Sequence, residues 1–257
     1  MNYLISVLIS TYDDRDFVEK KLAEIRRQTI FDQAEFIFIE TASPAHERDL
    51  LKPFCREHPN CRLIALNERK TLYEAWNLGW NAASAPIVCY SNMDDVMHPR
   101  LLELAVQHMT QKHWDICSVL IGKQPLDALS TDWSPARLKK LQLGNNPGPF
   151  TAWRADLKDR IGQFDGNLAI VGDREFWARA HYHHLKSGIV PGLLYLYSKS
   201  PGQLSKSPRF HELQENDRRL VAQKPYPLEF PPDWKRRLAS FKIIRALFPR
   251  KYIVPFP

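Results

Sequence analysis

Apolar runs alternate with helical patterns through the first half of the chain, and this alternation restricts the fold more than any other feature. The runs expected to be strands are Leu4–Ser10, Glu35–Glu40, Arg62–Leu66, Pro86–Ser91 and Asp115–Leu120. Between them, apolar residues recur three or four positions apart, which is typical of helices with one buried face. The pattern predicts an α/β fold with a mainly parallel sheet covered by helices on both faces.

Helices are expected between these runs, and two of them follow a proline, a residue that favours the first helical turn. Pro44 is expected to open a helix that continues to about Glu57, and Pro99 can start the helix after the fourth strand. Beyond Gly122 the pattern changes. The expected elements there are a helix near Pro135–Leu143, a block at Phe150–Arg154, a turn at Gly162–Gly166, a helix from about Asp173 and a strand at Ile189–Tyr197.

The overall composition is that of a globular protein. Of 257 residues, 44% are hydrophobic and 25% are charged, which argues against a disordered chain and against a multi-pass membrane protein. The opening run Met1–Ser10 lacks the basic n-region of a signal peptide and is too short to span a bilayer. The four cysteines form no Cys-x-x-Cys pair, so we expect reduced thiols and a cytoplasmic protein. We divide the chain into residues 1–224, with halves 1–121 and 122–224, and a segment 225–257.

Polar residues follow three of the expected strands, where ligands of open parallel sheets bind. These strand ends are Ser10–Asp13, Glu40–Ser43 and Asn92–Asp95. The adjacent carboxylates of Asp94 and Asp95 suit a hard cation such as Mg²⁺ or Mn²⁺, or they are ordinary turn residues. The sequence has only 10 glycines and neither Gly-x-Gly-x-x-Gly nor Gly-x-x-x-x-Gly-Lys. A dinucleotide site and a P-loop are therefore disfavoured.

Three further features have a chemical and a structural interpretation. Asp173 precedes a helical pattern and is either a general base or a helix N-cap, although position 176 lacks the Glu or Gln of a capping box. A histidine cluster fits the end of that helix better than a metal site: His181, His183 and His184. Three aromatic residues could stack on a sugar, although core packing is their commoner use: Trp133, Phe150 and Trp153.

Taken in order, several of these motifs resemble those of inverting family 2 type glycosyltransferases with a GT-A fold. The matching segments are Val7–Tyr12, Ile37–Ser43, Leu72–Gly79, Ser91–Asp95, Ile161–Asp165 and Gly172–Arg179. The resemblance spans about residues 3–205. It implies a GT-A fold in which residues 1–121 bind the nucleotide and residues 122–224 bind the acceptor.

The resemblance also implies a role for individual residues. Thr11, Tyr12, Glu40 and Asn77 would border the nucleotide, and Asn92 would lie near the ribose and phosphates. Asp94, with Asp95 beside it, would bind Mn²⁺ or Mg²⁺. Asp173 would be the general base.

Three positions depart from the family pattern. Asn92 stands where the first Asp of the Asp-x-Asp motif is usual, and Gly172 replaces the Glu of a Glu-Asp pair. Ser200 stands where many relatives have a metal-contacting His. Asn92 and Ser200 predict weaker metal binding, and Gly172 leaves Asp173 as the one acid of the pair. The Gln-x-x-Arg-Trp motif of processive synthases is absent from the sequence, which favours transfer of a single sugar.

The activity implied is transfer of one sugar, with inversion, from a nucleotide-sugar to an acceptor hydroxyl. UDP is the expected carrier, and the acceptor would be a saccharide or lipid-linked saccharide of cell-surface polysaccharide or glycolipid assembly. One alternative is a sugar nucleotidyltransferase, which the acidic segment Ser10–Asp14 disfavours because those enzymes hold a triphosphate in a basic loop. The other is a catalytically degenerate nucleotide-sugar binder, which Asn92 and Gly172 make conceivable.

The formal charge of +7 comes mostly from one end of the chain. Residues 233–257 contain one acid, Asp233, and seven basic residues: Lys235, Arg236, Arg237, Lys242, Arg245, Arg250 and Lys251. Apolar residues interleave with them at helical spacing. This segment could lie on an anionic membrane surface at the cytoplasmic face, or it could pack on the domain. The sheet segments have no basic face interleaved with aromatic residues, so nucleic acid is not an expected partner.

Overall fold

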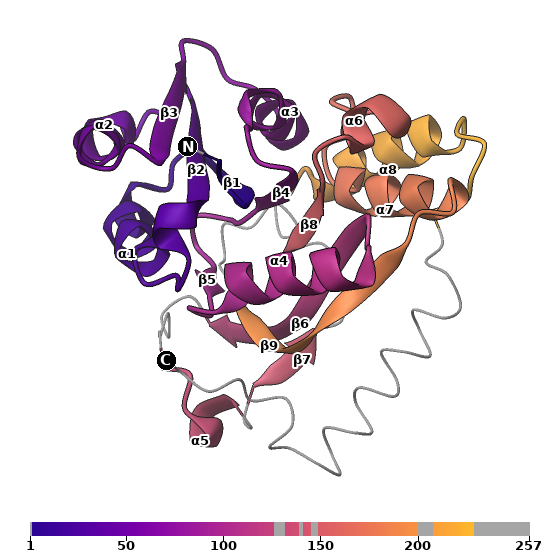
Figure 1. Cartoon of the computed structure of the whole chain (residues 1–257). Helices are drawn as coiled ribbons and strands as arrows, with labels where there is room; N and C mark the ends of the chain where they lie inside the picture. Colours follow the sequence, from indigo (N-terminus) through magenta and orange to yellow (C-terminus); the bar gives the residue numbers. More distant parts are fainter. Residues whose placement is uncertain (1, 126–131, 139–140, 145–148, 200–207, 229–257) are drawn as a thin grey trace.

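The computed structural model describes residues 2–125, 132–138, 141–144, 149–199 and 208–228. Within them a nine-stranded sheet has the order β3-β2-β1-β4-β8-β6-β9-β5, and β7 pairs with β6 (Figure 1). The strands are β1 (Ile5–Thr11), β2 (Ala34–Thr41), β3 (Cys61–Leu66), β4 (Ile87–Tyr90), β5 (Val96–Met97), β6 (Ile116–Pro125), β7 (Gln142–Gly144), β8 (Thr151–Arg154) and β9 (Ser187–Lys199).

The first half of the sheet is parallel and the second half is mixed. Strands β3, β2, β1 and β4 are parallel neighbours, as the alternation predicts. Strand β8 is antiparallel to both β4 and β6, whereas β6 and β9 are parallel and β5 is antiparallel to β9. The expected α/β fold is confirmed. The parallel half brings the carboxyl ends of β1, β2 and β4 to one edge.

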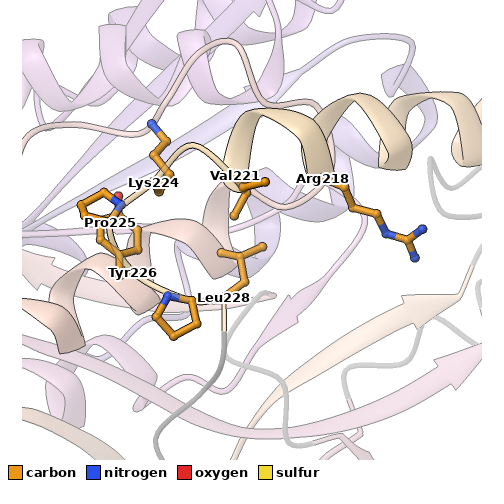
Figure 2. Close-up of a pocket in the computed structure, with 8 residues that line it drawn as sticks. Arg218, Val221, Lys224, Pro225, Tyr226 and Leu228 are labelled. Atoms are coloured by element: carbon orange, nitrogen blue, oxygen red, sulfur yellow. The ribbon is translucent and has the colours of Figure 1, made fainter.

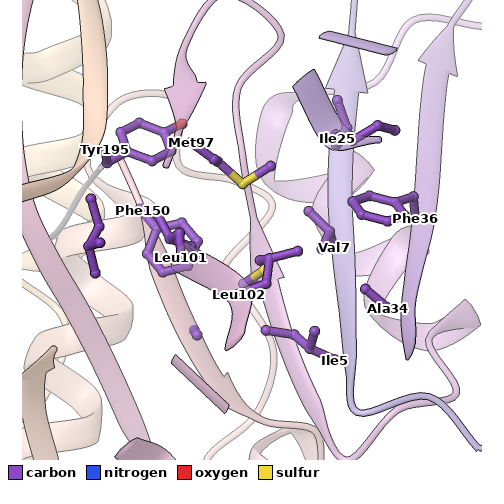
Figure 3. Close-up of a cluster of buried hydrophobic side chains, with 14 of the residues drawn as sticks. Ile5, Val7, Ile25, Ala34, Phe36, Met97, Leu101, Leu102, Phe150 and Tyr195 are labelled. Atoms are coloured by element: carbon purple, nitrogen blue, oxygen red, sulfur yellow. The ribbon is translucent and has the colours of Figure 1, made fainter. Parts of the chain in front are cut away.

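Helices cover both faces of the sheet (Figure 1). They are α1 (Arg15–Ile25), the short 3₁₀ helix η1 (Phe31–Gln33), α2 (Arg48–Glu57), α3 (Leu72–Ala82), α4 (Leu101–Lys112), α5 (Pro135–Leu138), α6 (Leu157–Arg160), α7 (Gly172–Tyr182) and α8 (Phe210–Val221). Alternate residues of β1 belong to two different hydrophobic clusters. Val7 and Ile9 belong to a cluster with residues of α1, α2 and α4, and Leu8 belongs to one with residues of α3, α6 and α7. Figure 3 shows Val7 among the first cluster, with Ile25 of α1 and Leu101 of α4.

The expected start of the second helix is wrong. Helix α2 begins at Arg48, four residues after Pro44, with Glu47 at its N-cap. The backbone of His46 has φ 56°, a left-handed conformation that a right-handed helix cannot contain. The Ser43 hydroxyl also accepts hydrogen bonds from the Asp13 and Ala45 N–H groups, at 2.9 and 3.2 Å. These contacts hold residues 43–46 as a turn.

Several elements were not expected from the sequence. Helix α8 and strand β5 have no counterpart in the predicted pattern, and α3 begins with an unforeseen capping box between Thr71 and Glu74. All four cysteines are free thiols, as predicted. The three candidate sugar-stacking aromatics are at most 5% exposed and therefore belong to the core: Trp133, Phe150 and Trp153.

No helix within the described residues is long and apolar enough to cross a bilayer. The basic segment 233–257 and Ser200 lie outside the described residues, so the expectations for them stay predictions. Residues 225–228 are described, and they pack on α7 through Tyr226. The Tyr226 hydroxyl donates to Glu175, and its ring lies 5.3 Å from that of Tyr182.

Candidate active site

The turn after β1 is fastened to the start of α2 by one buried carboxylate, Glu47. Its Oε1 accepts a hydrogen bond from the Thr11 hydroxyl at 3.2 Å and another from the Asp14 N–H at 2.7 Å. Burial alone would raise the pKa of Glu47, but the hydrogen bonds from Asp14, Ser43 and Thr11 outweigh it, and the net pKa is lowered. Glu47 therefore acts as a fixed anion that shapes this turn. The sequence analysis did not single it out.

The carboxylate of Glu40 is closed off by protein groups in the same region. Glu40 is fully buried, accepts a hydrogen bond from the Ser43 N–H and forms an ion pair with Arg48. The Arg48 guanidinium also donates to the Leu66 carbonyl at 2.7 Å. These contacts join the ends of β2 and β3 to α2. The nucleotide-binding role of Glu40 stays a prediction.

Tyr12 is half-buried and lies beside an arginine that the sequence analysis did not consider. The guanidinium carbon of Arg69 is 3.9 Å from the centre of the Tyr12 ring, a cation–π contact. Arg69 itself is exposed, in the loop between β3 and α3. An aromatic ring and a cation thus occur together next to the end of β1, a combination suited to a nucleotide.

The loop after β4 contains two carboxylates with opposite surroundings. Asp95 is 2% exposed and accepts hydrogen bonds from the Asn92 amide at 2.8 Å, the Tyr195 hydroxyl at 3.0 Å and the Ser198 N–H at 2.8 Å. Asp94 is half-buried. Among the described residues, no other side chain donates a hydrogen bond to it. Asp95 thus anchors the loop to β9, while Asp94 is left available to a ligand.

A buried ion pair from α1 supports this loop from beneath. The Lys21 ammonium, 1% exposed, donates to Glu24 at 2.9 Å, to the Asp95 carbonyl at 2.7 Å and to the Ser91 hydroxyl at 3.3 Å. Glu24 in turn accepts from the Met97 N–H at 3.1 Å. The pair holds both ends of the loop that presents Asp94.

Electrostatics in this region disfavour additional negative charge. Burial and the charge of Asp94 raise the pKa of Asp95 to about 8. Burial followed by the charges of Asp94, Glu47 and Asp13 raises the pKa of Asp14 to about 7, although the Tyr12 N–H opposes this. The pKa of Asp94 is also raised by burial, while the Lys21 charge lowers it. A cation bound here would relieve this repulsion.

The available ligands fit a cation that is shared with a bound phosphate rather than one enclosed by protein. Within the described part of the chain, no three His, Cys, Asp or Glu side chains gather into a metal-binding group. Mg²⁺, however, is commonly held by one or two carboxylates together with phosphate oxygens and water. Asp94 has a carboxylate suited to this arrangement, and its role as a metal ligand stays a prediction. The contacts of Asp95 assign it to loop anchoring, and its role as a metal ligand stays a prediction.

Asp173 lies in the first turn of α7 and is not its N-cap. The N-cap residue is Val171, which has no side-chain cap, so the alternative interpretation of Asp173 is wrong. Burial raises the pKa of Asp173 to about 6, although the Arg174 N–H, the Arg174 charge and the Tyr73 hydroxyl oppose the rise. The charge of Asp173 also raises the pKa of Tyr90, the last residue of β4. Gly172, the neighbour of Asp173, lies against Tyr73, and the ring of Tyr73 is 5.4 Å from that of Trp76, which stacks on Tyr90 at 3.8 Å. Asp173 therefore lies near the strand end that precedes the Asp94 loop.

The turn just before Asp173 is held by a carboxylate from α8. Asp217, 1% exposed, accepts hydrogen bonds from three successive N–H groups: Ala169 at 3.0 Å, Ile170 at 2.7 Å and Val171 at 3.0 Å. The position of α7, and with it that of Asp173, therefore depends on α8. Sequence analysis had no signal for this contact because the partners lie more than 45 residues apart.

Asn77 has a structural role here. Its amide donates to the Phe164 carbonyl at 2.8 Å and accepts from the Phe164 N–H at 3.1 Å. This two-point contact joins α3 to the turn at residues 161–166. The described hydrogen bonds of the Asn77 amide go to this turn, and its predicted contact with a nucleotide stays a prediction.

A cavity of about 480 Å³ lies elsewhere, at the end of α8 (Figure 2). Its lining consists of Arg218, Val221, Ala222, Lys224, Pro225, Tyr226, Pro227 and Leu228. None of the residues expected to bind a nucleotide or a metal lines it. The candidate active site is therefore the strand-end region, which the polar side chains after β1 and β4 and the first turn of α7 define.

The family profile described as glycosyl transferase family 2 matches residues 6–164, more than half of the chain. The chain belongs to glycosyl transferase family 2. This family 2 chain is 21% identical over 223 residues to the uncharacterized glycosyltransferase EpsJ of Bacillus subtilis, covering 80% of this chain and 64% of EpsJ. It therefore spans less than two thirds of that relative.

Solved structures share the fold of this family 2 chain. Residues 1–349 of TarS of S. aureus, in complex with UDP-GlcNAc, superimpose with a TM-score of 0.68 at 16% identity, covering 95% of this chain and 73% of that fragment. The mannosyltransferase PcManGT of Pyrobaculum calidifontis, in complex with GDP-Man and Mn²⁺, superimposes with a TM-score of 0.63 at 14% identity. The match covers 97% of this chain and 82% of the PcManGT chain. The expected GT-A fold is confirmed.

Proposed function

We propose that this chain transfers one sugar from a nucleotide-sugar donor to an acceptor hydroxyl, with inversion at the anomeric carbon. The single observation that carries the proposal is Asp173, a half-buried carboxylate with a pKa of about 6, near the end of β4. A base with such a pKa is ionised at neutral pH and can still accept a proton. Family membership and the available carboxylate of Asp94 support the same reaction.

In the proposed step, Asp173 removes the proton of the acceptor hydroxyl as its oxygen bonds to the anomeric carbon. The bond from that carbon to the diphosphate breaks, and the nucleoside diphosphate leaves with the electron pair on the opposite face. Asp94 would hold Mn²⁺ or Mg²⁺, which when bound neutralises charge on the departing diphosphate. Tyr12 and Arg69 would contact the nucleotide, and Lys21 would keep the Asp94 loop in place.

We propose UDP as the carrier, because TarS was crystallised with UDP-GlcNAc. PcManGT with GDP-Man and Mn²⁺ makes GDP the second carrier to test. The acceptor class proposed is a saccharide or lipid-linked saccharide of surface polysaccharide or glycolipid assembly.

The test compares wild type with Asp173→Asn, using UDP- and GDP-sugars with Mn²⁺ and a panel of saccharide acceptors. Asp173→Asn is expected to lower turnover by about 10²–10⁴-fold, the usual contribution of a general base, while donor binding by calorimetry is kept. The matched control is Asp159→Asn, which changes an exposed acid of α6 and should leave turnover unchanged. Undiminished turnover in Asp173→Asn would sink the assignment.

Two other outcomes would point to the alternatives. Donor binding by the wild-type protein without transfer or hydrolysis on any acceptor indicates a degenerate binder. Release of pyrophosphate from a nucleoside triphosphate and a sugar phosphate indicates a nucleotidyltransferase.

We also propose, from the sequence alone, that residues 233–257 bind an anionic membrane surface at the cytoplasmic face. Deleting these residues should abolish cosedimentation with liposomes rich in anionic lipid and leave turnover on soluble acceptors intact. Equal sedimentation of the full and shortened chains contradicts this proposal.

A further inference from the structure

Gly172, which replaces an expected glutamate, has no room for a side chain. A Cβ atom built on Gly172 would lie 2.6 Å from Cε2 of Tyr73 and 2.7 Å from its Cζ, closer than real Cβ contacts occur. The ring of Tyr73 therefore occupies the space that a side chain at position 172 would need. The glycine at position 172, where the family usually has Glu, and the tyrosine at position 73 therefore require each other.

Tyr73 is held firmly in this position. It is 2% exposed and lies in the first turn of α3, inside the capping box in which the Thr71 hydroxyl accepts from the Glu74 N–H at 3.3 Å. Its ring centre lies 5.4 Å from that of Trp76 and 5.9 Å from that of Phe164, which stacks on it. The hydroxyl cannot turn away from α7 unless this aromatic cluster moves.

The Tyr73 side chain lies directly against the start of α7, at Gly172. The N–H groups of Gly172 and Asp173, which are among those that a helix start leaves without partners, lower the pKa of its hydroxyl and so lie close to it. The hydroxyl in turn lowers the pKa of the Asp173 carboxyl, so the two side chains are close together. Burial and the charge of Asp173 raise the pKa of Tyr73 well above its ordinary value, so the hydroxyl keeps its proton.

We propose that Tyr73 is a positioning residue for Asp173, which orients the carboxylate by a hydrogen bond across the space that Gly172 leaves open. The inference rests on the proposed function, because it assigns Tyr73 a part in presenting the general base. The other titratable groups near Asp173 are Arg174 on α7 itself and Tyr90 on β4. The Tyr90 hydroxyl donates to Thr151 at 3.2 Å.

The experiment measures the ionisation of Asp173 directly, by carboxylate NMR of protein with ¹³C-labelled aspartate. The Asp173 signal is identified by its loss in Asp173→Asn. Tyr73→Phe keeps the ring and removes only the hydroxyl. The matched control is Tyr226→Phe, which removes a tyrosine hydroxyl from a different α7 carboxylate, Glu175. Thermal unfolding of each variant checks that it folds.

The hydroxyl stabilises the charged form of Asp173, so its removal should raise the Asp173 pKa above about 6. The acid limb of kcat/KM should move to higher pH with it, so that Tyr73→Phe loses more activity at about pH 6 than at about pH 8. Tyr226→Phe should leave the titration midpoint of Asp173 unchanged. An unchanged midpoint in folded Tyr73→Phe overturns the inference.

Gly172→Ala provides a second test, needed if Tyr73→Phe does not fold. The added methyl displaces the Tyr73 ring while the hydroxyl remains in the protein, and the Asp173 midpoint should again rise. Failure of the inference is distinguishable from failure of the proposed function. If Asp173→Asn keeps full turnover, the general-base assignment fails. If Asp173→Asn loses turnover but the titration midpoint of Asp173 is the same in wild type, Tyr73→Phe and Gly172→Ala, only the role of Tyr73 fails.

Discussion

Replacing Asp217 tests whether α8 holds the part of the molecule that carries Asp173. Asp217→Ala removes the acceptor of three hydrogen bonds, from the N–H groups of Ala169, Ile170 and Val171. Val171 is buried, so its N–H is left without a partner, at a cost of about 1–3 kcal/mol. Water can reach the other two, which lose bonds to a carboxylate. We expect a total loss of about 3–5 kcal/mol in the free energy of unfolding.

The assay is urea unfolding followed by circular dichroism at neutral pH, paired with turnover measured where the variant is folded. Asp217→Asn keeps the volume and one acceptor oxygen, so it should lose only about 1–2 kcal/mol. Glu212→Ala serves as a control on the same helix. That side chain is 72% exposed and lies 3.7 Å from Arg209, an ion pair of a kind that contributes about 0–1 kcal/mol.

The two readouts together identify what Asp217 does. If Asp217 only stabilises the fold, Asp217→Ala lowers the free energy of unfolding and the folded molecules keep the wild-type kcat. A role in placing α7 also lowers kcat, because Asp173 lies two residues beyond Val171. A loss below about 1 kcal/mol in Asp217→Ala, equal to that of Glu212→Ala, refutes the reasoning from buried N–H groups.

Three further predictions concern the Asp94 loop. Lys21→Met leaves Glu24 buried without its partner and should lower the free energy of unfolding by about 3–5 kcal/mol, measured by urea unfolding; the double replacement Lys21→Met, Glu24→Met should recover most of it. Asp94→Asn should remove the effect of Mn²⁺ on donor affinity in calorimetry, and an unchanged effect contradicts its role as ligand. Since a nearby cation favours ionised Asp14, whose pKa is about 7, Mn²⁺ affinity should rise from about pH 6 to 8, and Asp14→Asn should flatten that rise.

The sequence was sufficient for those features that depend on local patterns. Apolar runs and helical spacing located the strands from β1 to β4 within a residue or two, because β1, β2 and β4 bury their side chains between two layers. The same patterns placed Asp94 and Asp173 at the ends of elements. They could not show that Asp94 stays available while Asp95 is enclosed, since that depends on Tyr195 and Ser198 of β9.

The contacts that were missed join residues far apart in the chain. Helix α2 begins later than Pro44 suggests. The carboxylate of Glu47, its N-cap residue, is bound to the turn after β1, more than 30 residues earlier. Tyr73 could not be linked to Gly172 without knowing that α3 and α7 meet. In each case the sequence shows a residue type that is ordinary where it stands, and only the tertiary fold supplies its partner.

The acidic side chains of the site fall into two groups, those enclosed by hydrogen-bond donors of the protein and those open to a ligand. Chemistry can occur only at the second group. Four are enclosed by protein donors and hold turns or loops in place: Glu40, Glu47, Asp95 and Asp217. All four are at most 2% exposed, so neither a cation nor a substrate can reach them unless the surrounding structure moves. Asp94 and Asp173 are only half-buried, although Asp173 accepts a hydrogen bond from the Arg174 N–H. Replacing an enclosed acid should therefore act first on stability, whereas replacing Asp94 or Asp173 should act on turnover at nearly unchanged stability.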